Sequence, residues 1–212
     1  MDATRLVGVT IDRALPATGY EAALVEELRA GSEEAFAYLV AVYQHPVYNL
    51  ISHIVEDGTE AADVLQEVFV KVFRGIGQFH GESSLKTWIY RIAVHEASNH
   101  RRGWFRRHLR EAFSLDAART DSDKALAGAL VRPETPYQAL EQVERQRIVW
   151  RALASLAQPY RAVVVLREIE GLAYGEIAQV LGVSEGTVKS RLIRGRELLK
   201  RKLTGCLGKR DV

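Results

Sequence analysis

The apolar residues of this chain recur every three or four positions, the spacing that places them on one face of an α-helix. The period-two alternation and the hairpin turns of β-strands do not recur. Helix starts are marked by Ser32 before two glutamates, by Thr59 before Glu60, and by Pro136 and Pro159. The expected helices lie near 20–30, 33–55, 60–75, 84–102, 136–156, 159–170, 174–181 and 185–203. The sequence therefore predicts an all-α protein.

The fourth and fifth of these helices are separated by an acidic segment, 111–133, which is rich in alanine and has no stripe of large apolar residues. A chain of 212 residues is long enough for two small domains with separate cores. We therefore expect two small helical domains, 20–110 and 134–204, joined by a flexible acidic linker at 111–133. A fluctuating helix inside the linker is the alternative. Residues 1–19 are expected to be a disordered N-terminal tail, and residues 205–212 a C-terminal tail.

Charge is distributed unevenly along the chain, and the net charge of +2 conceals this. Residues 20–85 carry 3 basic and 11 acidic groups, and residues 111–144 carry 3 and 7. Residues 86–110 carry 7 basic groups and 1 acidic group, and residues 145–212 carry 14 and 6. A basic block is a candidate for contact with phosphates, although a solvated surface can have the same composition.

Several classes of function have no support in the sequence. The single cysteine, Cys206, allows neither an internal disulfide nor a Cys-x-x-Cys pair, which favours a cytoplasmic protein. The sequence shows no secretory signal and no run of 18 apolar residues. The His-Glu-x-x-His, P-loop and nucleophile-elbow motifs are also missing. We therefore expect a binding protein without catalytic residues, metal or cofactor, and not an enzyme.

The third predicted helix, 60–75, has an apolar face and an acidic face. The apolar face is a continuous stripe of Ala61, Val64, Leu65, Val68, Phe69 and Val72. The opposite arc holds Asp63, Gln66, Glu67, the apolar Val70 and Arg74. Such an arc suits docking on a basic protein partner. A solvated face with one exposed valine is the alternative.

The fourth predicted helix, 84–102, combines cations with aromatic rings. It is expected to bury Leu85, Ile89, Ile92 and Ala93, with Trp88 at the margin of that stripe. The outward arc comprises Lys86, Thr87, Tyr90, Arg91, His95, Ser98, Arg101 and Arg102, and is followed by Trp104, Phe105, Arg106 and Arg107. Cations can meet phosphates and flat rings can stack on unpaired bases, so this arc predicts a single-strand-binding surface with Tyr90 exposed. Residues 79–83 form the loop before it, where an extruded base could be held.

Residues 174–196 have the pattern of a helix-turn-helix. Its interior and turn are expected to comprise Ile177, Ala178, Leu181, Gly182, Val183, Ser184, Val188, Leu192, Gly195 and Leu199. Gly182 permits a sharp turn, and Ser184 can cap the second helix. The outer side of that helix holds Thr187, Lys189, Ser190, Ile193 and Arg194. Hydroxyls, an apolar group and cations on one arc can enter a major groove and contact base edges. An ordinary helical hairpin is the alternative.

Four stretches of the chain resemble motifs of the extracytoplasmic-function sigma factors. In chain order they are Asp63-Val-Leu-Gln-Glu-Val-Phe, Leu85-Lys-Thr-Trp-Ile-Tyr-Arg-Ile-Ala, Tyr160-Arg-Ala-Val-Val-Val-Leu-Arg-Glu and Gly186-Thr-Val-Lys-Ser-Arg-Leu-Ile-Arg-Gly-Arg. The resemblance covers roughly 24–110 and 136–203. Four motifs in the family's order are far more specific than one helix-turn-helix. His95 departs from the asparagine that many relatives have after the second motif, whereas Asn99 agrees with a common pattern.

The resemblance implies an alternative sigma factor, which joins core RNA polymerase and directs it to specific promoters. It implies docking on the coiled coil of the largest polymerase subunit, through Asp63, Gln66, Glu67 and Val70, and contact with the polymerase flap. It implies recognition of the melted −10 element by Phe79, His80, Ser83, Lys86, Thr87, Tyr90, Arg91, His95, Asn99, Arg101 and Arg102. It implies recognition of the duplex −35 element by Ser184, Thr187, Lys189, Ser190, Ile193 and Arg194. It also implies a linker that threads toward the polymerase active centre and an anti-sigma partner, with no small-molecule substrate and no membrane insertion.

Two other classes of protein fit parts of the sequence. An ordinary helix-turn-helix repressor or activator would use 20–110 for sensing or dimerisation, and would bind duplex operator tightly without polymerase. A nucleic-acid enzyme would need Glu67 or His95 as a catalytic base, and the sequence offers neither of them an orienting partner.

Overall fold

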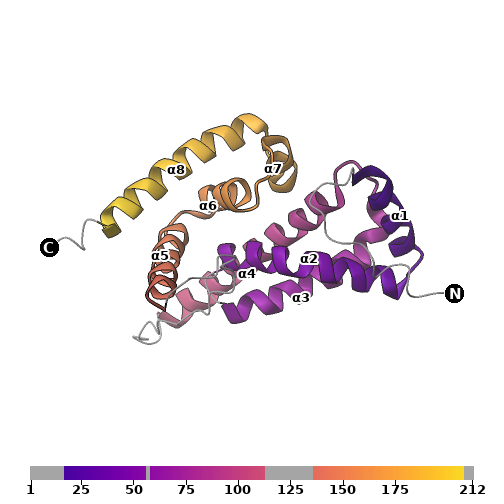
Figure 1. Ribbon diagram of the computed structural model, residues 1–212, viewed down its shortest axis with the longest axis horizontal. Helices are drawn as coiled ribbons and strands as arrows, with labels where there is room; N and C mark the ends of the chain where they lie inside the picture. The colour runs from indigo at the N-terminus through magenta and orange to yellow at the C-terminus, as the bar shows by residue number, and fades with distance from the viewer. Residues whose placement is uncertain (1–16, 56–57, 113–135, 208–212) are drawn as a thin grey trace.

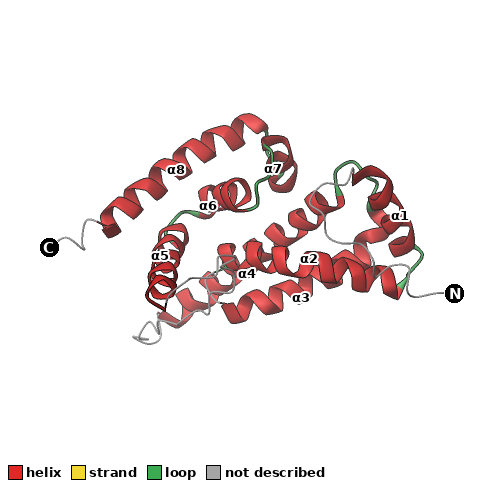
Figure 2. Cartoon of the chain, in the orientation of Figure 1, coloured by secondary structure: helices red, strands yellow, loops and turns green. Residues whose placement is uncertain are grey.

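The computed structural model describes residues 17–55, 58–112 and 136–207, and every regular element in these ranges is helical (Figure 2). The elements are α1 (Ala17–Arg29), α2 (Glu33–Ile54), α3 (Gly58–Gly75), the 3₁₀ turn η2 (Ile76–Gln78), α4 (Leu85–Ala112), α5 (Pro136–Ala154), α6 (Gln158–Val164), the π-helical turn η3 (Val165–Ile169), α7 (Tyr174–Leu181) and α8 (Glu185–Leu207). The predicted all-α fold is confirmed.

The first four helices form an N-terminal domain. Helices α2, α3 and α4 pack along one another, and α1 lies across one end of them (Figure 1). Their apolar stripes meet in a core in which Leu39, Leu50, Val64 and Ile89 are completely buried. Ser32 begins α2 as predicted, since its side chain accepts a hydrogen bond from the Ala35 amide at 3.2 Å.

Helices α5 to α8 form a C-terminal domain in which α6 and α8 cross closely. Gly195 lies at the crossing, where a Cβ atom would stand 2.7 Å from Val164 Cγ2 and 3.3 Å from the Tyr160 carbonyl oxygen. Only a glycine allows this approach of the two helices. The crossing fixes the direction of α8, the helix with the predicted DNA-facing arc.

The two domains pack against each other, and one cluster of buried apolar residues runs through both. Arg161 of α6 is almost completely buried, and its Nη1 donates to the Ile54 carbonyl at the end of α2, at 3.0 Å. The His53 ring stacks on Trp150 of α5, with centroids 4.3 Å apart. The amino-acid pattern did not predict this closed arrangement, because its contacts join residues about a hundred positions apart.

Two helices extend beyond their predicted ends. Helix α4 continues from the predicted residue 102 to Ala112, into the first residues of the predicted linker, and α8 continues to Leu207, into the predicted C-terminal tail. Arginine, leucine and alanine are good helix formers, so the polar stretch after residue 102 can remain helical. Helix α1 begins at Ala17, so the last residues of the tail predicted at 1–19 are helical. The rest of that tail, most of the predicted linker and residues 208–212 of the predicted C-terminal tail lie outside the described residues.

Candidate nucleic-acid interface

The helix-turn-helix is formed by α7 and α8, and its turn has the predicted construction. Gly182 ends α7 in the left-handed conformation, with φ of 63°. The Val183 amide then donates to the Ala178 carbonyl at 3.1 Å. Ser184 caps α8, because its Oγ accepts from the Thr187 amide at 3.2 Å. These bonds fix the first turn of α8 relative to α7.

The outer arc of α8 is available to a partner. Lys189, Ser190 and Arg194 are exposed, Thr187 is half-buried, and Ile193 is 61% exposed although it is a large apolar residue. The opposite face of the helix packs into the core of the domain. Arg194 is also held near Glu197, with Nη1 3.3 Å from Oε2, in a contact that water reaches from both sides. A weak, solvated ion pair of this kind leaves a cation free to exchange partners.

The acidic arc of α3 is likewise exposed. Asp63, Gln66 and Glu67 lie on the surface, and Val70 is 46% exposed. The buried stripe on the other side of the helix is confirmed. Phe73 is 57% exposed, one turn beyond Val70, and was missed by the sequence analysis. Its spacing of three from Val70 is the signal that could have found it.

Several residues of the predicted −10 surface are not exposed. Tyr90 and Thr87 of α4 are buried, as is Phe79 in the loop before it, with exposed fractions of 0%, 1% and 5%. The expectation that Tyr90 and Thr87 lie on an outward arc is therefore wrong for this arrangement. The Phe79 ring packs on Trp88, with centroids 5.4 Å apart, so it belongs to the core of the domain.

The other predicted −10 residues are at least partly accessible. Those that are exposed are His80, Arg91, His95 and Arg102, and those that are half-buried are Ser83, Lys86, Asn99 and Arg101. Arg102 Nη2 donates to Asn99 Oδ1 at 2.6 Å. Lys86 Nζ lies 5.2 Å from the centroid of the Tyr90 ring. The side chains of residues 104–107 are outside what the structure describes.

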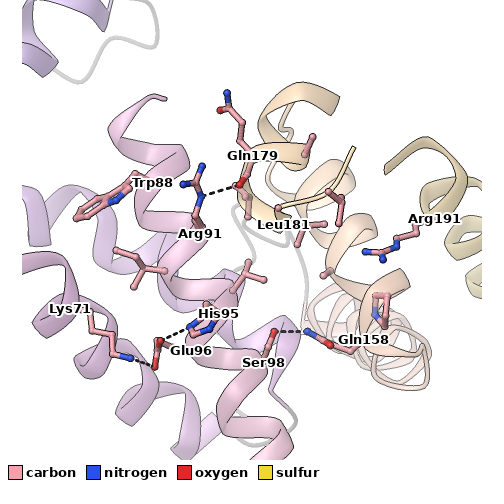
Figure 3. A pocket seen from close by; sticks show the side chains of 18 of the residues that line it. Lys71, Trp88, Arg91, His95, Glu96, Ser98, Gln158, Gln179, Leu181 and Arg191 are labelled. Carbon is pink, nitrogen blue, oxygen red and sulfur yellow. Dashed lines mark hydrogen bonds and ion pairs between the residues drawn. The ribbon is translucent and has the colours of Figure 1, made fainter. Parts of the chain in front are cut away.

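The C-terminal domain is what covers the α4 arc. The Tyr90 hydroxyl donates to Glu170 Oε2 at 2.6 Å. Arg91 Nε donates to the Gln179 carbonyl of α7 at 3.0 Å (Figure 3). Gln158 at the start of α6 donates to the Ser98 hydroxyl, and Ser98 is itself buried, contrary to prediction. Glu170, Gln179 and Gln158 had no sequence signal, because each meets a residue 60 to 88 positions away.

Burial shifts the pKa values of both groups in the contact between Tyr90 and Glu170. Burial raises the pKa of the Glu170 carboxyl above its ordinary range, while the hydrogen bond from Tyr90 and the nearby Lys86 lower it. Burial, followed by the bond to Glu170, raises the pKa of Tyr90 well above its ordinary value. The Tyr90 hydroxyl is therefore a permanent donor at neutral pH.

A charged residue of α4, Glu96, faces α3 within the N-terminal domain. Glu96 is buried and forms an ion pair of 2.7 Å with Lys71 of α3, and His95 Nδ1 lies 2.9 Å from its other oxygen (Figure 3). Burial acts to raise the pKa of Glu96, but the bonds to Lys71 and His95 outweigh it and hold that pKa below its ordinary value. Glu96 thus ties α4 to α3 and orients His95.

A groove of about 1250 Å³ remains between the two domains. Arg91 and His95 of α4 line one side, and Leu181 and Arg191 of the helix-turn-helix line the other (Figure 3). The two predicted DNA-binding elements therefore share one solvent-filled space in the closed arrangement.

Within the described residues, no group of three or more histidine, cysteine, aspartate or glutamate side chains is placed to hold a metal ion. In the same part of the chain, no helix is both long and apolar enough to cross a membrane.

The fold and these surfaces define a two-domain helical protein of the nucleic-acid-binding class, with a helix-turn-helix in one domain and a basic helix beside an exposed acidic face in the other. The family model for sigma-70 region 2 matches residues 39–110, and the model for sigma-70 region 4 matches residues 146–199. The chain belongs to the sigma-70 family, among the extracytoplasmic-function sigma factors. Members of this family are not enzymes, so family membership identifies a binding protein.

The match to two similar proteins extends over nearly the whole length of each of them. The chain is 38% identical over 180 residues to the ECF RNA polymerase sigma-E factor of Escherichia coli K12, covering 85% of this chain and 92% of that protein. It is 39% identical over 181 residues to the RNA polymerase sigma-H factor of Pseudomonas aeruginosa, with the same coverage. The structure of CnrH in complex with the cytosolic domain of CnrY has the same fold, with a TM-score of 0.63, 23% identity, and coverage of 87% of this chain and 97% of that one.

Proposed function

We propose that this sigma factor joins core RNA polymerase and divides promoter recognition between its domains, the C-terminal one for duplex −35 DNA and the N-terminal one for the melted −10 strand. The observation that carries the proposal is the outer arc of α8. Ile193 is 61% exposed beside Arg194 and one turn beyond Lys189, on the helix whose first turn is capped by Ser184. Arginine and lysine can bond guanine, and an apolar side chain can contact a thymine methyl group.

The −10 surface is made of the loop 79–84 and the basic arc of α4. Arg91 and Arg102 are exposed there and can neutralise phosphates, and His95 is exposed between them. Tyr90 can stack on an unpaired base only after it separates from Glu170, because its ring is completely buried in the closed arrangement. Capture of the −10 strand through Tyr90 therefore requires the two domains to move apart.

Core polymerase would dock on the exposed arc of α3. Asp63 and Glu67 supply negative charge, and Val70 and Phe73 supply apolar area beside it. Phe36 of α2 packs edge-on against Phe73 at 5.1 Å and extends this apolar area. An acidic rim around an apolar centre fits a basic helical partner, the chemistry of a polymerase coiled coil.

The site of action and the regulation follow from this function. A factor that works on RNA polymerase acts in the cytoplasm. A further solved structure with this fold is the sigma factor RpoE in complex with the anti-sigma factor NepR from Bartonella quintana, at a TM-score of 0.61 and 21% identity. We infer an anti-sigma partner for this chain as well. The groove between the domains offers such a partner contact with both of them.

In vitro transcription with purified core polymerase on a library of promoters tests the proposal. Wild-type protein should select promoters with a common −35 and −10 sequence. Arg194→Ala should relax the base preference at one or two −35 positions, a cost of about 1–3 kcal/mol for a bidentate base contact. Glu67→Lys should weaken binding to core polymerase while helical content stays constant.

Two variants serve as matched controls. Arg201 is exposed on the same face of α8, two turns further along, so Arg201→Ala should leave base preference unchanged. Glu34 is exposed on α2, so Glu34→Lys makes the same change of charge on a different helix. If wild-type protein selected no promoters with core polymerase and instead bound duplex DNA tightly alone, the simple helix-turn-helix regulator would replace this proposal.

A further inference from the structure

Helix α1 lies outside the family match, which begins at residue 39, and its sequence pattern gave it no function. One face of α1 covers the core, where Leu24, Val25 and Leu28 are buried. Covering the core requires only these apolar residues and does not require charged ones. Helix α1 also has Glu21 and Arg29 along the edge that faces the loop 79–84, and both side chains form long-range hydrogen bonds there.

The first bond is at the end of the loop. Glu21 Oε1 accepts from the backbone amide of Leu85, the first residue of α4, at 2.7 Å. The first amides of a helix have no partner within the helix, and a carboxylate satisfies them well because they are the positive end of the helix dipole. Ser84 Oγ accepts from the Thr87 amide at 3.1 Å, so the start of α4 is fixed by two side chains.

The second bond is at the beginning of the loop. Arg29 Nη2 donates to the Phe79 carbonyl, and Arg29 Nη1 is held by Glu26 Oε1 at 2.6 Å. Glu21 and Arg29 are eight residues apart, about 12 Å along the helix at 1.5 Å per residue. One rigid helix therefore sets the distance between the two ends of the loop.

The ends of the loop are also held by the packing of Phe79 on Trp88 and by the cap that Ser84 forms, but the middle of the loop is open to solvent. Its central residues, His80, Gly81 and Glu82, are exposed, and Gly81 has a φ of 74°, which favours glycine. A pocket of about 500 Å³ lies between the loop and α1, and both Glu21 and Arg29 line it together with His80. Helix α1 therefore forms one wall of a cavity on the predicted −10 surface.

We infer that Glu21 and Arg29 are positioning residues for recognition of the −10 element, because they hold the two ends of the loop 79–84 at a fixed separation on α1. This inference rests on the proposed function. Neither residue needs to touch DNA. Each acts by restricting the loop to the shape in which it accepts an unpaired base, so their loss lowers discrimination between bases more than it lowers binding to polymerase.

The test uses core polymerase reconstituted with full-length wild type, Glu21→Ala, Arg29→Ala or the control Glu27→Ala, since Glu27 is exposed on the same helix. Transcription is measured on one promoter set in which each −10 base is replaced in turn, and on a second set in which −35 bases are replaced. In both test variants the ratio between the preferred and the substituted −10 base should fall about tenfold, while −35 ratios stay constant. Glu21→Gln keeps an acceptor oxygen and should restore most of the discrimination.

Unchanged −10 ratios in both variants would overturn the inference and leave α1 as a cover for the core. An equal fall at both promoter elements, or loss of core binding, would overturn it too, because the role would then be general stability. These results differ from failure of the proposed function, in which wild-type protein itself would show no promoter selection.

Discussion

The contact between Tyr90 and Glu170 allows closure of the two domains to be tested with the loss of one oxygen atom. Tyr90→Phe keeps the buried ring and removes the hydroxyl that donates to Glu170 at 2.6 Å. The other described interdomain bonds, among them that from Arg91 to the Gln179 carbonyl, are left in place. The variant therefore weakens closure without removing the ring that would stack on DNA.

The expected size of the effect follows from the chemistry of the bond. A hydrogen bond to a charged group is worth about 1.5–3 kcal/mol net, and a half-buried carboxylate left without its donor is costly. Each 1.4 kcal/mol is tenfold in an equilibrium constant, so the ratio of closed to open protein should fall at least about tenfold. Since Tyr90 is completely buried in the closed form, only the open form can stack its ring on a base.

Two measurements on the full-length protein check this. Fluorescence anisotropy should show Tyr90→Phe binding single-stranded −10 DNA up to about tenfold more tightly than wild type. Small-angle X-ray scattering should show a larger radius of gyration. Tyr90→Ala should expand in the same way but gain no affinity, because it also lacks the ring.

Tyr48 is a half-buried tyrosine of α2, so Tyr48→Phe is a control for the loss of a phenol hydroxyl. Tyr90→Phe with wild-type affinity and wild-type dimensions would show that the hydroxyl does not restrain the domains. Tighter binding by Tyr90→Ala as well would show that the ring is not needed for the strand.

Two further predictions concern the contact between the domains at His53 and the packing of α6 on α8. Burial lowers the pKa of His53, which stacks on Trp150, so closure is fully present above the ordinary pKa of 6.5 and is lost as the pH falls below it. Scattering at pH 7.5 and 5.5 should show expansion in wild type and less in His53→Phe, and equal expansion in both would assign the effect to other groups. Gly195→Ala should lower stability by about 1 kcal/mol, because overpacking against Val164 at 2.7 Å exceeds the gain in helix propensity. Thermal denaturation should show a midpoint about 2–4 °C lower, and an unchanged midpoint would mean that α6 and α8 separate at little cost.

The parts of the protein that could be predicted are those whose information is local. The stripe of α3 and the turn at Gly182 follow from spacings of a few residues, and the structure confirms both. Exposure of Asp63, Glu67 and Ile193 followed from the same periodicity. In each case, contacts within a single domain determine which face of the helix is buried and which is exposed.

The predictions that failed are those in which a second domain decides the environment. Tyr90 was placed on an outward arc because the N-terminal domain alone does not need it in its apolar stripe. The structure covers it with Glu170, which is 80 positions away, and no pattern within either helix records that pairing. The roles of Glu21 and Arg29 were not predicted for a related reason: their partners belong to the same domain, but Leu85 of α4 and Phe79 of the loop lie 64 and 50 positions away respectively.

The hydrogen bonds between the C-terminal domain and α4 are formed by polar groups that water or DNA could also bind. A contact made through Tyr90, Arg91 and Ser98 exchanges hydrogen bonds within the protein for bonds to water or to DNA, at a small net cost. An apolar contact of similar size would be lost without replacement when the domains separate. The arc that we propose to meet phosphates and bases can therefore also meet the C-terminal domain. If promoter DNA uses the same polar groups, the free protein is closed through groups that the DNA has to reach.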